Sequence, residues 1–261
     1  MIFMTTVRTS TVYLYGDSMR VLRRFWWVLP VILIVAAVGF VAWASATQPI
    51  EAEAEAALQS EAAVLVDTTQ WLTFTPVGSE PTTGFIFYPG GKVDARAYAP
   101  LAQAVAEAGY LAVIVPMPLN LAILGLNTAN DVIAAYPNIQ QWALGGHSLG
   151  GSMAARFVTD NPGQVDGLVL MASYSDRDLS ALPVAVSVIY GSLDGLATVA
   201  QVEGGAALLP ADTTWVKIEG GNHGQFGWYG AQERDNAATI SHEEQYAQII
   251  AGTLALLERI Q

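Results

Sequence analysis

The stretch "WALGGHSLGGSMAARF", residues 142–157, places Ser148 among four glycines that all lie within three residues of it. Glycine is costly to order, so a cluster marks tight backbone geometry or a close approach of two chain segments. The pattern G-x-S-x-G is typical of a nucleophile elbow, a sharp strand-to-helix turn that exposes a serine hydroxyl. An ordinary turn that packs a strand against a helix would use the same glycines, so the rest of the chain has to separate the two interpretations.

Short apolar runs alternate with helical patterns from about residue 64 onward. Because the strand-like runs are apolar throughout, they predict an α/β fold with a mostly parallel sheet covered by helices on both faces. Ligands of such sheets bind at the carboxyl ends of the strands. The expected strands cover 64–77 (as one or two), 84–91, 110–117, 139–148, 165–175, 183–195 and 213–223; the expected helices cover 97–109, 121–136, 149–161, 198–209 and 241–260.

A serine hydroxyl attacks only when a base takes its proton, and histidine is the residue whose pKa suits that task. The chain has three histidines. His147 precedes Ser148 and is expected to point elsewhere on the elbow, while His242 begins the last helix and is expected to be exposed. His223 follows the last expected strand in a glycine-rich loop. It is therefore the expected base, with an ordinary surface histidine as the alternative.

The base works best when a carboxylate orients it. Asp194, in "VIYGSLDGLA", follows the penultimate expected strand, which places it beside the loop of His223. Asp176 and Asp178 follow the strand before that and are the alternatives. Any of the three aspartates could instead be a turn cap. Position on the sheet favours Asp194.

A tetrahedral intermediate needs two donors for its oxyanion. One is expected to be the backbone N–H of Leu149, which follows the serine at a helix N-terminus. The other is expected from the turn "FYPGGKVD", where Gly91 can approach a substrate most closely. Gly90 and Lys92 are the neighbouring candidates, and a simple tight turn is the alternative to any oxyanion role.

Four motifs together resemble the α/β-hydrolase superfamily, in particular small lid-poor serine hydrolases related to dienelactone hydrolases. They are "FYPGG", "GHSLGG", "YGSLDG" and "GGNHGQFG", and the resemblance covers about residues 64–258. It implies the α/β-hydrolase fold and the chain order Ser148, Asp194, His223 for a catalytic triad. Tyr88-Pro89 replaces the usual His-Gly, so the second oxyanion donor is not carried over from the resemblance. A serine replaces the cysteine of typical dienelactone hydrolases, so their substrate is not carried over.

These expectations describe a serine hydrolase that cleaves an ester or related acyl bond of a small molecule through an acyl-enzyme. An acyltransferase with the same triad and a non-catalytic binding module of the same fold are the alternatives. No cofactor and no metal are expected. The 45 residues between Ser148 and Asp194 leave little room for a helical lid. Trp228 and Tyr229 either line the pocket or pack under the last helix.

Residues 25–44, "FWWVLPVILIVAAVGFVAWA", form an uncharged run long enough to cross a bilayer as a helix. Arg20, Arg23 and Arg24 precede it, so the positive-inside rule places the N-terminus in the cytoplasm and the catalytic domain outside. "ASA" at 44–46 resembles a signal-peptidase site, and cleavage there would give a secreted protein. The expected division is 1–24 cytoplasmic segment, 25–46 transmembrane anchor or signal peptide, 47–63 acidic linker or short helix, and 64–261 hydrolase domain.

Charge and cysteine content exclude several partners. Beyond residue 46 the chain carries seven basic and 22 acidic side chains, a net charge of −15. Such a field repels nucleic acid and anionic lipid headgroups. Cysteine is absent, which rules out disulfides, thiolate ligands and a cysteine nucleophile. The expected partners are therefore a small acyl substrate and, through residues 25–44, a lipid bilayer; the sequence does not fix an oligomeric state.

Overall fold

The structure is a computed structural model that describes residues 26–261. The chain divides into two compact units, one ending at Trp43 and the other comprising Ala44–Gln261. Each unit is described by itself. The expected cytoplasmic segment 1–24, with its three arginines, lies outside the described residues.

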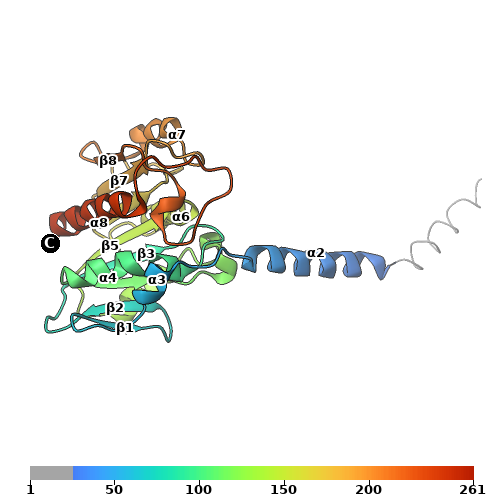
Figure 1. Cartoon of the computed structure of the whole chain (residues 1–261), viewed down its shortest axis with the longest axis horizontal. Helices are drawn as coiled ribbons and strands as arrows, with labels where there is room; N and C mark the ends of the chain where they lie inside the picture. The colour runs from blue at the N-terminus through green and yellow to red at the C-terminus, as the bar shows by residue number, and fades with distance from the viewer. Residues whose placement is uncertain (1–25) are drawn as a thin grey trace, which may run out of the picture. The chain divides into compact units, whose positions relative to one another are not determined.

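Helix α2 (Val28–Ser45) carries the apolar run (Figure 1). Its 18 residues would span about 27 Å at 1.5 Å per residue, close to the thickness of a bilayer core. The helix has a mean hydropathy of 2.4, and large apolar side chains such as Leu29, Leu33 and Val38 are exposed. A helix that is apolar on every side is typical of a lipid environment. Within residues 26–261, α2 is the one helix long and apolar enough to cross a membrane, a property that signal sequences share.

The second unit is built on an eight-stranded sheet of order β1-β2-β4-β3-β5-β6-β7-β8. From β4 to β8 all neighbours pair in parallel, whereas β1 pairs with β2, and β2 with β4, antiparallel. The mostly parallel sheet is thus confirmed, and the opening run 64–77 forms two strands at its antiparallel edge. The strands are β1 (Val64–Asp67), β2 (Leu72–Pro76), β3 (Thr83–Tyr88), β4 (Leu111–Ile114), β5 (Gln141–His147), β6 (Gly167–Met171), β7 (Ala185–Gly191) and β8 (Thr214–Ile218).

Successive side chains of a strand point to opposite faces, and both faces of this sheet are buried. In β3, Phe85 and Phe87 join one apolar cluster, and Ile86 and Tyr88 join the other. This explains why the strands are apolar throughout instead of alternating with polar residues. The two clusters form the core on either side of the sheet.

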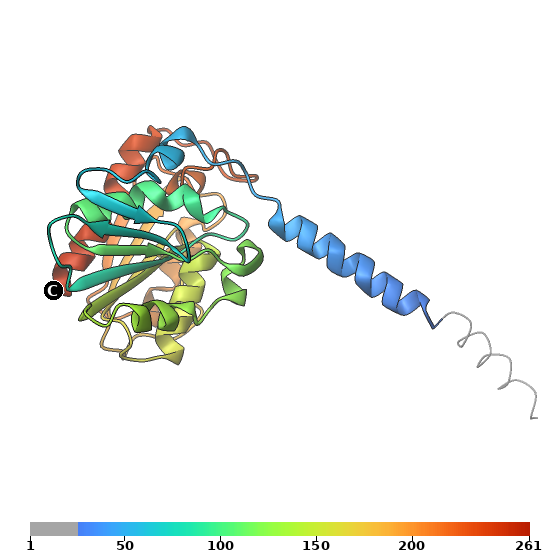
Figure 2. The same ribbon diagram turned by 90° about the horizontal axis from the view of Figure 1, so that it is seen from below.

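The helices divide between these two faces, as Figure 2 shows, with α4 and α8 on one side and α6 on the other. Helix α8 begins with a capping box between Ser241 and Glu244, which satisfies backbone donors of its first turn. The α-helices of this unit are α3 (Ala52–Ala56), α4 (Ala99–Glu107), α5 (Thr128–Ala135), α6 (Leu149–Asp160), α7 (Val199–Gly204) and α8 (His242–Arg259); the 3₁₀ turns are η1 (Ala95–Tyr98), η2 (Pro118–Asn120), η3 (Ala122–Leu124), η4 (Ala206–Leu208) and η5 (Gly224–Phe226).

Two expected helices are shorter in the structure. The helix expected over 121–136 is split into η3 and α5, with Gly125 at the end of η3. The helix expected over 198–209 ends as α7 at Gly204 and continues as η4. Glycine disfavours a helix interior, which accounts for both breaks.

The acidic stretch before the sheet forms the short helix α3. Its Ala54 is completely buried in the same cluster as α4 and α8. The backbone N–H of Glu51 donates to the carbonyl of Trp228 at 3.0 Å. The start of the second unit is therefore tied to the segment that follows His223.

Candidate active site

Ser148 occupies the single residue between β5 and α6. Its φ of 53° and ψ of −120° lie in a region that a residue with a side chain adopts at a cost of about 1–3 kcal/mol. Its N–H donates to the carbonyl of Met171 at 2.9 Å, and its carbonyl accepts from Ser173 Oγ at 2.8 Å. The neighbouring β6 edge thus holds Ser148 in a strained conformation, as a nucleophile elbow requires.

The glycines around Ser148 are required by crowding. A Cβ on Gly150 would lie 2.1 Å from the carbonyl oxygen of Tyr88, and one on Gly146 would lie 2.5 Å from the carbonyl carbon of Gly150. A Cβ on Gly151 would meet the oxygen of Gly146 at 2.6 Å. These neighbours are backbone atoms and cannot rotate away. Only glycine allows α6 to start this close to the ends of β3 and β5.

Asp194 and His223 form a buried ionisable pair at this edge of the sheet. His223 Nδ1 lies 2.8 Å from Asp194 Oδ2, and both side chains are at least 95% buried. The other oxygen, Oδ1, accepts from the N–H groups of Leu196 at 2.8 Å and Ala197 at 2.7 Å. Because a carboxylate only accepts hydrogen bonds, Nδ1 of His223 carries the proton. Nε2 is then left as an acceptor.

The alternative aspartates have other partners. Asp176 forms an exposed ion pair with Arg156, in which Nε lies 3.0 Å from Oδ1. Asp178 accepts from the N–H and hydroxyl of Ser180 at 2.9 and 2.6 Å, as a turn cap does. Neither contacts His223, so the structure brings only Asp194 to the histidine.

The loop of His223 reaches from β8 across β7 and β6 toward the elbow. The N–H of Leu193 donates to the carbonyl of Gly221 at 2.8 Å, which anchors this loop to the turn after β7. The ring of His223 then lies 4.5 Å, centroid to centroid, from the ring of His147, the residue before Ser148. Within the described part of the chain, no hydrogen bond joins the Ser148 hydroxyl to His223. The structure thus brings the imidazole of His223 next to the residue that precedes Ser148.

A second, buried polar chain runs beneath the site. The N–H of Gly90 donates to Tyr98 Oη at 3.0 Å, and the same hydroxyl lies 2.8 Å from His147 Nδ1. The Tyr98 hydroxyl therefore links the glycine turn at Gly90 to the imidazole of His147. Burial, and then the nearby His223, hold the pKa of His147 well below its usual range. His147 is therefore a buried residue whose Nδ1 is held by Tyr98.

The candidate oxyanion donors differ in whether their backbone N–H groups already have a hydrogen-bond partner. The N–H of Gly90 is used by Tyr98, and that of Lys92 donates to the carbonyl of Asn120 at 2.8 Å. The N–H of Gly91 and that of Leu149, the first residue of α6, have no hydrogen-bond partner in residues 26–261. A Cβ on Gly91 would contact Leu149 Cδ2 at 3.1 Å, so the two residues are neighbours. The two expected donors are the free ones.

Trp228 and Tyr229, whose role the sequence leaves open, are packing residues. Trp228 stacks on His242 with ring centroids 3.8 Å apart and packs edge-on against Tyr246. Tyr229 is 2% exposed and contacts the ring of His147. The expectation that His242 is exposed is wrong, because the Trp228 ring covers it and only 16% of its side chain is exposed.

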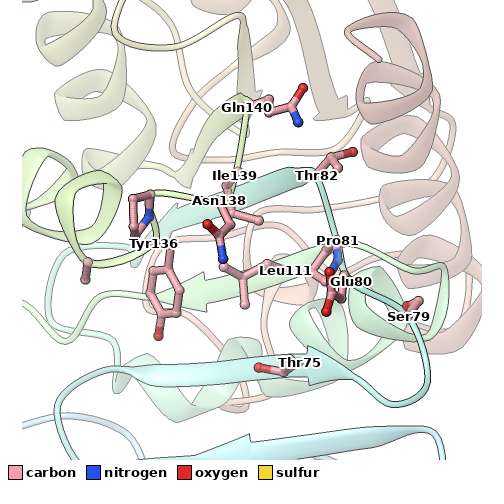
Figure 3. A pocket seen from close by; sticks show the side chains of 12 residues that line it. Thr75, Ser79, Glu80, Pro81, Thr82, Leu111, Tyr136, Asn138, Ile139 and Gln140 are labelled. Atoms are coloured by element: carbon pink, nitrogen blue, oxygen red, sulfur yellow. The ribbon is translucent and has the colours of Figure 1, made fainter.

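Two hollows lie near or opposite this region. One, of about 440 Å³, borders both neighbours of His223, Asn222 and Gly224, and is lined by polar residues that include Asp235. The other, of about 820 Å³, lies at the amino ends of the strands, between Thr82 and Gln140 (Figure 3). It is at the wrong edge of the sheet to serve Ser148. No group of His, Asp and Glu side chains suited to a metal ion occurs in the described part of the chain.

Sequence reasoning missed several residues that support this region. Gln245, completely buried in α8, binds both backbone groups of Asn222, as acceptor at 2.9 Å and donor at 2.8 Å. It lies four residues before Ile249 on the apolar stripe of α8, so a polar residue on a buried face was the available signal. Tyr98 and Ser173 gave no comparable signal, because each acts through a contact distant in sequence.

Comparison with known proteins fits this geometry. The sequence profile of the alpha/beta hydrolase family matches residues 84–247, which contain all the site residues discussed. The chain therefore belongs to the alpha/beta hydrolase family, and this assignment supports a hydrolase. No curated protein matches the sequence. Among solved structures it is similar to the esterase domain of a Rhodothermus marinus protein, with a TM-score of 0.54 and 13% identity over 71% of this chain and 91% of that chain. At that identity the likeness concerns the fold.

The buried chain through Tyr98 predicts a large effect of removing one oxygen. Tyr98→Phe leaves the Gly90 N–H and His147 Nδ1 without partners in a dry interior, at a cost of about 2 kcal/mol or more. The melting temperature should fall by roughly 4–8 °C for a unit of this size, measured by circular dichroism. Tyr190→Phe is the matched control, since the Tyr190 hydroxyl donates only to the exposed Glu203. Equal melting temperatures for the two variants would contradict this account.

Proposed function

We propose that this hydrolase is a serine hydrolase that cleaves a carboxylic ester or related acyl bond of a small molecule. In this proposal Ser148 is the nucleophile, His223 the base and Asp194 the residue that orients the base. The single observation that carries it is the 2.8 Å contact of His223 Nδ1 with Asp194, made while the imidazole lies against the residue preceding a strained serine.

The proton inventory supports this assignment of roles. The Nδ1–H group of His223 donates to Asp194, so Nε2 of His223 has a lone pair available for the serine proton. In the proposed mechanism the Ser148 hydroxyl gives its proton to that lone pair. Attack on the acyl carbon gives an acyl-enzyme, and the imidazolium returns its proton to the leaving group. A water molecule then releases the acid by the same route.

The oxyanion would be stabilised by the backbone N–H groups of Leu149 and Gly91. Both lack another partner in residues 26–261, and Leu149 also lies at the positive end of the α6 dipole. Tyr88, which stands where relatives have histidine, takes no part. Its hydroxyl donates to the carbonyl of Leu126 at 2.8 Å and accepts from the N–H of Ala129 at 2.9 Å.

Ser148→Ala should abolish hydrolysis of a p-nitrophenyl ester, with kcat reduced on the order of 10³-fold or more. Folding should be retained, because the substitution removes one hydroxyl that has no hydrogen-bond partner in the described residues and leaves the backbone unchanged. The measurement is steady-state hydrolysis by purified wild type and variant at matched circular dichroism spectra. Wild-type turnover by the alanine variant would rule out Ser148 as the nucleophile.

Asp194→Asn should lower kcat by up to roughly 10⁴-fold, as the loss of the orienting carboxylate does in a serine–histidine–aspartate site. The amide can turn its NH₂ toward His223 and select the wrong tautomer. Asp176→Asn is the matched control, since Asp176 only pairs with Arg156 at the surface. The assignment fails if Asp176→Asn inactivates the enzyme while Asp194→Asn leaves it active.

We also propose that α2 anchors the protein in a membrane with the hydrolase unit outside. The length and uniformly apolar surface of α2 support a span, and the three arginines before it support a cytoplasmic N-terminus. An uncleaved anchor is favoured over a signal peptide because the run is longer than a typical signal-peptide core.

This topology predicts that the full-length chain stays in the membrane pellet after a carbonate wash, with its C-terminal unit open to external protease. A soluble exported product with a new N-terminus near Thr47 would show instead that the helix is a cleaved signal peptide. Protection of the C-terminal unit in intact cells would contradict the orientation.

A further inference from the structure

The segment 231–240, between the histidine loop and α8, returns across both loops that carry Asp194 and His223. Its Asp235 accepts two backbone N–H groups. Oδ1 accepts from Gly195 at 2.9 Å, and Oδ2 accepts from Gly224 at 2.8 Å. Gly195 directly follows Asp194, and Gly224 directly follows His223. One carboxylate therefore bridges the residues that come after each member of the pair.

The next residue, Asn236, makes the matching contacts on the other side. Its Nδ2 donates to the carbonyl of Leu193 at 3.0 Å, and its own carbonyl accepts from Asn222 Nδ2 at 2.8 Å. Leu193 directly precedes Asp194, and Asn222 directly precedes His223. The dipeptide Asp235-Asn236 thus contacts the residues on both sides of Asp194 and of His223.

The dipeptide is itself held in a defined conformation. Arg234 has a φ of 69°, which turns the chain sharply just before Asp235. A Cβ on Gly195 would lie 2.8 Å from the carbonyl oxygen of Arg234, so the acid loop and this turn are in backbone contact. Asp235 Oδ1 also accepts from the N–H of Asn236 at 2.9 Å, which fixes its carboxylate plane.

We propose that Asp235 and Asn236 are positioning residues that set the distance and orientation between Asp194 and His223. The proposal rests on the proposed hydrolase function. Asp194 and His223 come from loops 29 residues apart, each on its own strand end. Because one dipeptide forms hydrogen bonds with both loops, it fixes the distance between them. A displacement of about 1 Å in such a site costs on the order of 10²-fold in rate.

Asp235→Asn tests this with almost no change in shape. The amide has one acceptor oxygen, so its NH₂ must face the N–H of either Gly195 or Gly224. The NH₂ of the asparagine and that backbone N–H are then two donors facing each other, so one of the two loops loses its hydrogen bond to residue 235. Glu233→Gln is the matched control, because it removes the same charge two residues away. Glu233 is exposed and forms no hydrogen bond or ion pair in residues 26–261.

For the full-length protein hydrolysing p-nitrophenyl butyrate, Asp235→Asn should lower kcat about 10- to 100-fold and change KM less than about twofold. Glu233→Gln should match the wild type. Asn236→Ala, at an exposed position where folding is not at risk, should lower kcat several-fold by releasing Leu193. The proposal is overturned if both Asp235→Asn and Asn236→Ala have wild-type kcat. It is also overturned if one of the two variants has wild-type kcat and the other does not fold.

A double variant separates positioning from general damage. If Asp235 acts through the Asp194–His223 pair, Asp235→Asn should add no further loss to Asp194→Asn. Losses that multiply would show that Asp235 acts elsewhere, and would overturn the proposal. Failure of the proposed function is distinguishable: in that case the wild type itself neither hydrolyses the ester nor reacts with a fluorophosphonate at Ser148.

Discussion

The close approach of α6 to the end of β3 is the constraint on which this molecule depends. Gly150 lies so near the carbonyl oxygen of Tyr88 that no side chain atom fits between them. The residue directly before the helix is Ser148, and it has a positive φ of 53°. The strain therefore fixes which side chain is presented at the carboxyl edge of the sheet, and the loops after β7 and β8 are arranged around it.

Two polar networks hold the carboxyl edge of the sheet around Asp194 and His223. In the first, Tyr98 links the glycine turn at Gly90 to His147, with all three groups buried. Burial, and then the ring of His223 4.5 Å away, hold the pKa of His147 well below its usual range. In the second network, the backbone N–H groups of Gly195 and Gly224, which follow Asp194 and His223, both donate to the carboxylate of Asp235. The site is thus positioned mainly by hydrogen bonds to backbone groups.

The sequence predicts the parts of this site that carry local signals. Ser148 is marked by its glycines, and His223 and Asp194 by polar turns after apolar strands. Leu149 and Gly91 are predicted because an oxyanion needs backbone N–H donors beside the serine and in the turn after β3. The antiparallel pairing of β2 with β4 has no local signal, because pairing direction depends on chain topology. Asp235 and Asn236 look like ordinary loop residues, since bonds from a side chain to a distant backbone leave no periodicity. The burial of His242 could not be predicted, because the Trp228 ring that covers it belongs to a different segment of the chain.

The central claim is that the strained serine is a reactive nucleophile served by His223. Its most direct test is reaction of the purified full-length protein with a fluorophosphonate, followed by peptide mass spectrometry. The account predicts a single phosphonyl adduct on Ser148, formed far more slowly when His223 is replaced by alanine. No adduct, or an adduct on another residue that forms equally well in Ser148→Ala, would contradict it.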